Sequence, residues 1–155
     1  PKKIEALAGQ RVVAVSAGAM HSLAVTADGT VWSWGNGLYG KLGHGDGQTQ
    51  LLPKKVEALA GRQDQLLPKK IEALAGQRVV AVSAGFSHSI AVTADGAVWS
   101  WGNGANGQLG HGDQQEQQLP KEIADFAGRR VVAVSAGAYH SLAITAEGAV
   151  WSWGY

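Results

Sequence analysis

The chain has 155 residues, a formal net charge of +1 and no cysteine. The near-neutral balance argues against binding driven by a strongly basic field, to nucleic acid or to an acidic membrane, and the lack of cysteine excludes disulfides, thiolate metal sites and cysteine nucleophiles. Hydrophobic residues make up 45% and charged residues 16%, which argues against intrinsic disorder. No stretch approaches the ~20 apolar residues of a membrane-spanning helix, so we expect no membrane insertion.

The predicted elements are short strands separated by glycine-containing turns. Residues 12–17 are apolar and rich in β-branched side chains, which predicts a buried strand. A second strand is expected at 21–26, with alternate side chains on opposite faces. Asp28-Gly29 predicts a hairpin turn, because glycine tolerates the positive φ of tight turns. A third strand follows at 30–34, and then a glycine-rich loop at 35–47.

Two interpretations are open for the segment after this loop. Pro53–Leu59 fits a fourth, edge strand, since proline is tolerated at the start of a strand. The related sequence PKKIEALAG, at 1–9 and 68–76, fits a helical turn, although it is short and lacks a good N-cap.

These elements recur because the chain is a nearly verbatim repeat. RVVAVSAGAMHSLAVT at 11–26 returns at 78–93 and again at 130–145 with few changes, and the prolines at 1, 53, 68 and 120 are spaced by 52, 15 and 52 residues. We therefore divide the chain into complete units at 1–52 and 68–119, a remnant at 53–67 and an incomplete unit at 120–155.

The remnant holds the beginning and the end of a unit without its middle. A unit shortened in this way would uncover the faces of its neighbours, which is costly in apolar burial. Two explanations stay open: a deletion within the repeat, or an omitted stretch between Arg62 and Gln63.

Three or four antiparallel strands per repeat of about 50 residues are typical of a β-propeller. The string G-x-x-H-S-[LI]-A-[VI]-T-A-[DE]-G-x-V-W-S-W-G occurs three times, and twice it continues into G-x-x-G-x-L-G-H-G. This pattern resembles the repeats of the regulator-of-chromosome-condensation family. The expected fold is all-β, an RCC-type propeller with four-stranded antiparallel blades, present as an incomplete arc of about three blades. Propellers have about 4–8 blades, so the arc would belong to a larger chain or close by association.

The resemblance also bears on function. Members of this family usually form seven-bladed propellers and include an exchange factor for the small GTPase Ran, a plant UV-B photoreceptor, a β-lactamase inhibitor and modules of ubiquitin ligases. It implies an intracellular protein, in the cytoplasm or nucleus. The shared role is to bind other proteins. The fold by itself does not indicate which of these functions the chain has.

The motifs that suggest chemistry have structural explanations. Three equivalent histidines could ring a metal, but their spacings of 67 and 52 residues and the lack of adjacent carboxylates favour a structural role (His21, His88 and His140). The resemblance implies that each histidine and the following serine pack and hydrogen-bond within the blade. Neighbouring residues on a strand face opposite sides, so these pairs cannot be nucleophile and base. We expect no enzymatic activity, no cofactor and no metal.

Two further motifs have structural alternatives. The G-x-G-x-x-G runs at 35–40 and 102–107 match a dinucleotide fingerprint, but glycine-rich LGHG follows them where a helix is needed. All six tryptophans lie in VWSWG strands and are expected to pack between blades. A photoreceptor role is disfavoured, because the segments GAMH, GFSH and GAYH lack the tryptophan and arginine that the plant receptor carries before this histidine.

Differences among the units indicate where specificity could lie. These differences concentrate in predicted loops, where binding residues on a rigid frame usually lie. They include large side chains, which are favoured at interfaces. Neutral drift is the competing explanation for the differences. The candidate partner-binding residues are Met20, Tyr39, Lys41, Phe86 and Tyr139.

We expect a non-enzymatic protein–protein interaction scaffold within a larger protein or assembly, with nucleic acid an unlikely partner. The alternatives are a guanine nucleotide exchange factor for a Ran-like small GTPase and, less favoured, a UV-B photoreceptor-like protein.

Overall fold

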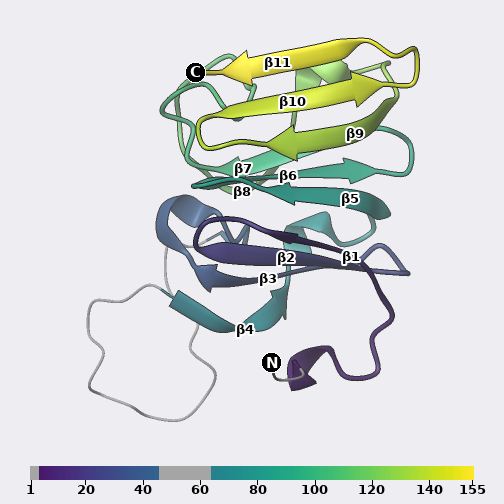
Figure 1. Cartoon of the computed structure of the whole chain (residues 1–155), viewed down its shortest axis with the longest axis vertical. Helices are drawn as coiled ribbons and strands as arrows, with labels where there is room; N and C mark the ends of the chain where they lie inside the picture. Colours follow the sequence, from purple (N-terminus) through teal and green to yellow (C-terminus); the bar gives the residue numbers. More distant parts are fainter. Residues whose placement is uncertain (1–3, 46–63) are drawn as a thin grey trace.

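The computed structural model describes residues 4–45 and 64–155. Within these ranges the fold is all-β, with three antiparallel sheets stacked along the long axis of the molecule (Figure 1). The sheets have the strand orders β1-β2-β3-β4, β5-β6-β7-β8 and β9-β10-β11. Each sheet is a blade, and the three blades form an incomplete propeller. No helix in the described ranges is long and apolar enough to span a membrane.

The strands are short and follow the repeat. Their bounds are β1 Val12–Ala17, β2 His21–Thr26, β3 Val31–Asn36, β4 Asp64–Lys70, β5 Val79–Ala84, β6 His88–Thr93, β7 Val98–Gly102, β8 Gln117–Glu122, β9 Val131–Ala136, β10 His140–Thr145 and β11 Val150–Gly154. Four 3-10 turns lie between them, η1 Glu5–Leu7, η2 Leu38–Gly40, η3 Glu72–Leu74 and η4 Ala124–Phe126. The strands predicted at 12–17 and 21–26 are confirmed, and the third begins one residue later than expected and runs to Asn36.

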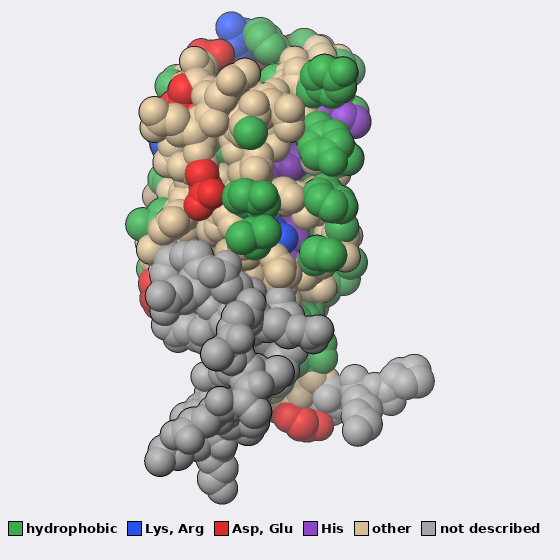
Figure 2. Space-filling view, turned by 90° about the vertical axis from the view of Figure 1, so that its left-hand side faces the viewer, with side chains coloured by type: hydrophobic (Ala, Val, Ile, Leu, Met, Phe, Trp, Pro, Cys, Tyr) green, Lys and Arg blue, Asp and Glu red, His purple; other side chains and the backbone are tan. Residues whose placement is uncertain are grey.

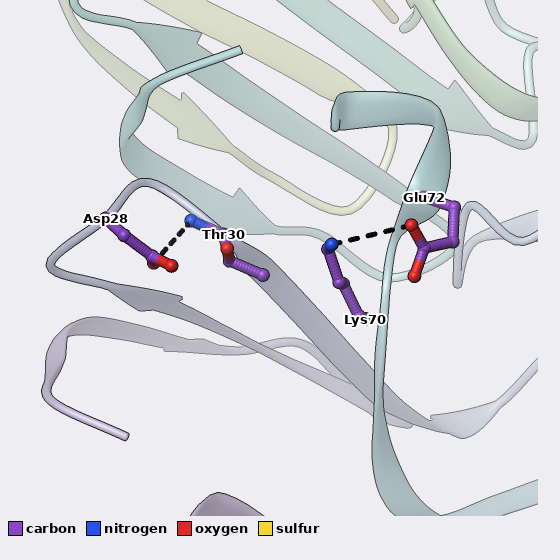
Figure 3. Close-up of polar contacts among 4 residues, drawn as sticks. All are labelled: Asp28, Thr30, Lys70 and Glu72. Carbon is purple, nitrogen blue, oxygen red and sulfur yellow. Dashed lines mark hydrogen bonds and ion pairs between the residues drawn. The ribbon is translucent and has the colours of Figure 1, made fainter. Parts of the chain in front are cut away.

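The third strand starts late because Thr30 belongs to the hairpin turn. Its carbonyl oxygen accepts a hydrogen bond from the Thr26 amide, and its own amide donates to Oδ1 of Asp28 at 3.1 Å (Figure 3). Gly29 has φ 86°, which confirms the predicted need for glycine in this turn. The same turn recurs at Gly96 and Gly148 with φ of 92° and 81°.

The fourth strand of each complete blade comes from the segment that precedes the next blade. Pro68 lies within β4 and Pro120 within β8, and the next residues form the 3-10 turns η3 and η4. An exposed ion pair joins Lys70, the last residue of β4, to Glu72 in η3 at 3.5 Å (Figure 3). The PKK segment is therefore strand and EAL is a helical turn at 68–74. The predicted strand at Pro53–Leu59, and the junction of Arg62 and Gln63, lie outside the described residues.

The core lies between the blades. All six residues of β6 are buried, since the middle blade is covered on both faces, whereas the burial of β10 alternates strictly because one face of the third blade is open. Trp101 is completely buried in the cluster between the first two blades, and Trp151 and Trp153 pack against the cluster between the second and third. The predicted packing of tryptophans between blades is confirmed at these positions.

Candidate protein-interaction surface

Three equivalent loops carry large apolar side chains at one side of the blade stack. They connect the first two strands of each blade, at 18–20, 85–87 and 137–139. Met20 is 59% exposed, Phe86 45% and Tyr139 47%. The rings of Phe86 and Tyr139 lie 6.1 Å apart, centroid to centroid, across the junction between the second and third blades. We call these three residues the loop ridge.

The view in Figure 2 faces the side of the molecule that carries these loops. Hydrophobic side chains gather there in a column beside histidines, over all three blades. The loops are short and tightly held. Gly35 and Gly102, at the ends of β3 and β7, have φ of 112° and 106°, and a Cβ on either glycine would approach a loop carbonyl oxygen to 2.6 Å or less. The loop ridge therefore stands on backbone that has little freedom to move.

Beneath the loop ridge, buried polar side chains join successive blades. His21 Nε2 lies 2.8 Å from Ser89 Oγ in the next blade, and the serine hydroxyl donates to the Lys41 carbonyl oxygen at 2.9 Å. Trp101 Nε1 donates to the same carbonyl oxygen at 2.9 Å. The loop after β3 thus reaches over the second blade and holds two of its side chains.

The second junction repeats this network. His88 Nε2 lies 2.9 Å from Ser141 Oγ, and the Gln108 carbonyl oxygen accepts bonds from Ser141 and from Trp153 Nε1, each at 2.8 Å. The expectation that each histidine and serine bond within one blade is therefore wrong. Adjacent residues of a strand point to opposite faces, so the histidine of one blade meets the serine of the next.

The network assigns a protonation state to these histidines. Each serine hydroxyl has a single hydrogen, which it donates to a carbonyl oxygen, so the histidine donates from Nε2. Nδ1 of His21 and of His88 is buried without a hydrogen-bond partner, which favours the neutral ring because a proton there would have no acceptor. Burial lowers the pKa of His21 from 6.5 to about 3, with the charge of Lys41 as the next cause. Burial likewise lowers the pKa of His88 to about 4. His140, on the open face of the third blade, is exposed.

The candidates Tyr39 and Lys41 have different environments. Tyr39 is 38% exposed and lies in η2, which packs against β7 and β8 of the next blade. Its φ of 63° makes it the one non-glycine residue in the described ranges with positive φ. Lys41 is only 2% exposed, so its side chain does not contribute to the surface. Sequence comparison of the units selected Lys41 because Gln108 replaces it, but the fold uses the backbone carbonyl at this position.

The remaining histidines also have structural partners. His44 Nε2 lies 2.8 Å from Ser33 Oγ, and His111 Nε2 lies 3.0 Å from Ser100 Oγ, in both cases within one blade. In the part of the chain that is described, no group of three or more histidine, aspartate or glutamate side chains is arranged to hold a metal ion. The inter-blade bonds were missed by sequence reasoning, although the recurring His-Ser pair was the signal for them.

Stacked antiparallel blades with apolar faces and repeated junctions define an RCC1-type β-propeller module. Two patterns of the regulator of chromosome condensation (RCC1) repeat match the chain, one at residues 28–63 and 95–144 and the other at 12–41 and 79–108. The chain belongs to this repeat family.

Curated relatives contain this module within longer chains. The human E3 ubiquitin-protein ligase HERC2 is 41% identical over 154 residues, which cover 99% of this chain and 3% of HERC2. The ultraviolet-B receptor UVR8 of Arabidopsis thaliana is 39% identical over 156 residues, which cover 100% of this chain and 32% of UVR8. This chain thus spans a third or less of the length of these two relatives.

Solved structures show the same arrangement of blades. Human WBSCR16 superposes with a TM-score of 0.75 at 30% identity, over 94% of this chain and 34% of that one. Prp20p of Saccharomyces cerevisiae, characterised for its binding to Gsp1p and histones, superposes with a TM-score of 0.74 at 25% identity, over 88% of this chain and 31% of that one. The expected propeller arc is confirmed.

Proposed function

We propose that this chain is a non-enzymatic protein-binding module and that its partner docks on the loop ridge. The observation that carries the proposal is the exposure of Met20, Phe86 and Tyr139 at equivalent loops of three consecutive blades. Large apolar side chains are costly to leave in water and are enriched at the centres of protein interfaces. Because the loops are held by the junction network, a partner would meet a surface already formed, which lowers the entropy cost of binding.

Three other exposed apolar residues provide a matched control. Val13, Val80 and Val132 occupy equivalent positions in the first strand of each blade and are 46–54% exposed. The strand register shifts at these positions, so each valine is a bulge residue. We call them the bulge valines. They match the loop ridge in number, with one residue in each blade, and in apolar character, but they are not in the loops.

The test is affinity capture with quantitative mass spectrometry. Three forms are compared: the unaltered chain, a triple alanine variant of the loop ridge and a triple alanine variant of the bulge valines. Proteins bound by the unaltered chain and the control but lost with the loop-ridge variant support the proposal. If the loop-ridge variant retains every protein that the control retains, this surface is not the binding site.

The second candidate is a guanine nucleotide exchange factor. The observation that favours it is the likeness to Prp20p, a protein characterised for its binding to Gsp1p. Exchange acts by protein contact that distorts a nucleotide site, so it needs no acid or base from this chain. A nucleotide-release assay with a panel of small GTPases separates the two candidates. Faster release with any of them favours exchange, and no acceleration across the panel removes it.

A further inference from the structure

The two ends of the blade stack are complementary halves of the junction that the chain already forms twice. In each junction, one blade contributes the face of Leu23 and Val25 or their equivalents, and the next contributes the face of its tryptophan pair. The third blade leaves the first kind of face open, and the first blade leaves the second kind open. The open faces of one chain therefore have the composition of a complete junction.

The open face of the third blade is apolar. Leu142, Ile144 and Val150 are 37%, 41% and 70% exposed. Their equivalents in the second blade are Ile90, Val92 and Val98, which are completely buried against the third blade. The side chains are aliphatic in both blades, so the difference in exposure comes from the packing of the third blade against the second and not from polarity. This face therefore has the same apolar surface that already forms two junctions.

The open face of the first blade carries an apolar hollow of about 520 Å³. It is lined by residues that include Leu7, Val12, Val15 and Ala17, and none of the lining residues is charged. Val15 is 71% exposed, whereas its equivalents Val82 and Val134 pack against the junction clusters. In both existing junctions the side chains that face these valines come from the Leu23-type face of the preceding blade.

The polar groups of the junction are also present at both open faces. In the existing junctions the amide of Ala84 donates to Ser16 Oγ at 3.0 Å, and the amide of Ala136 donates to Ser83 Oγ at 2.9 Å. At the open faces the equivalent groups are the Ala17 amide and Ser135 Oγ. The equivalent of the His21–Ser89 bond would join His140 to Ser22, of which the first is exposed and the second partly exposed.

The backbone hydrogen-bonding groups at the two open ends of the stack also correspond to those of an existing junction. The amide of Ile71 donates to the Val31 carbonyl at 2.7 Å, and the amide of Ile123 donates to the Val98 carbonyl at 2.8 Å. The equivalent groups are the amide of Ile4 and the carbonyl of Val150, at the edge of the three-stranded third sheet. Each of these isoleucines lies 8 residues before the first strand of its blade. The register needed to extend this edge is therefore already present.

We propose that a second copy of this chain docks head to tail, with the open face of its first blade on the open face of the third blade. The contact is heterologous, because two different faces meet. Two copies would bring together six blades, within the range of about 4–8 found in propellers, so both pairs of open faces can be covered in one closed dimer. This inference does not depend on the function of the loop ridge.

The test blocks each open face separately, with Val15→Glu on the first blade and Ile144→Glu on the third. Mass is measured by size-exclusion chromatography with light scattering. The unaltered chain is expected at twice its mass of 16.1 kDa, and each variant alone at 16.1 kDa. A mixture of the two variants should recover a 1:1 dimer, because each retains the face that the other has lost. Val13→Glu, at a bulge valine, is the matched control and should leave the dimer intact.

Each alternative gives a different result. If a face pairs with its own copy, one of the two variants alone stays dimeric, and the head-to-tail contact is wrong. If the unaltered chain is a monomer over the whole concentration range, the proposal is overturned. Species at a series of multiples of the chain mass would support the head-to-tail contact. They would contradict the closed dimer, because the copies would then form open chains.

A second measurement does not depend on the stability of the charged variants. The chain contains no cysteine, so Ala17→Cys and Ser135→Cys introduce single reactive groups. A short bismaleimide should cross-link the mixture of the two variants and neither variant with itself. Cross-linking of either variant alone, or none in the mixture, contradicts the proposed contact.

Discussion

Nε2 of His21 lies 2.8 Å from Oγ of Ser89, and this buried bond joins two blades through residues 68 positions apart. The same bond joins His88 to Ser141, whereas His140 at the open face is exposed. One sequence motif therefore occurs in two environments within a single chain. This difference provides internal controls for two of the following predictions.

Replacing His88 by alanine should destabilise the chain by about 3 kcal/mol, because it removes a buried hydrogen bond and leaves a cavity. The measurement is urea unfolding at pH 7. His140→Ala is the matched control and should change stability by less than about 0.5 kcal/mol, as for an exposed side chain. Both are made in the Val15→Glu background, in which a second copy cannot cover His140. Equal effects at the two positions would contradict the junction role.

Stability should fall as the solution is acidified from about pH 6.5 to about pH 4. The pKa of His21 is lowered to about 3 and that of His88 to about 4, from 6.5, so the unfolded chain binds protons first. At pH 5 each histidine should account for a loss of about 2 kcal/mol. The lowered pKa values of Asp28 and Asp95 act in a separate window, below their ordinary 3.8.

The measurement for this pH dependence is urea unfolding at a series of pH values. His88→Asn removes one titrating group and should reduce the slope between pH 6.5 and pH 5. Burial also lowers the pKa of His111, so His111→Asn is compared to separate its contribution. An unchanged slope in His88→Asn would show that this histidine is not buried in the neutral form.

Tyr39→Asn should stabilise the chain by about 0.5–1 kcal/mol, because Tyr39 has a φ of 63° and asparagine adopts this region with less strain. Thermal unfolding is the readout. Leu38→Asn, at an exposed neighbour without positive φ, should not raise the melting temperature. A lower melting temperature for Tyr39→Asn would mean that contacts of the ring outweigh the backbone strain.

Gly85→Ala should be strongly destabilising, by about 3 kcal/mol, since overpacking against backbone cannot relax easily. A Cβ at Gly85 would lie 2.5 Å from the carbonyl oxygen of Gly137 in the next blade. Gly137→Ala is the control in the Val15→Glu background. There the nearest atoms belong to the exposed ring of His140, which can move away. A smaller loss at Gly85 than at Gly137 would contradict this close approach of the blades.

The exposure of the candidate binding residues could be predicted only in part. Met20, Phe86, Tyr39 and Tyr139 are exposed, as large residues at variable loop positions suggested, but Lys41 is buried. Variation between units indicates that a side chain is not constrained, which occurs on a surface or wherever only the backbone is used. The contact between Phe86 and Tyr139 was also not predictable, because they occupy different positions of the repeat and meet only across a junction.

The sequence by itself determined the all-β class, the strands, the glycine turns such as Asp28-Gly29 and the packing of the tryptophans in the second and third blades. These features depend on local alternation, on backbone preference and on a repeat that is visible along the chain. Only the tertiary structure decided that His21 bonds with Ser89 and not within its own blade, and which faces of the stack remain open. The reason is physical: both depend on how one blade is offset against the next, and no local pattern of residues encodes that offset.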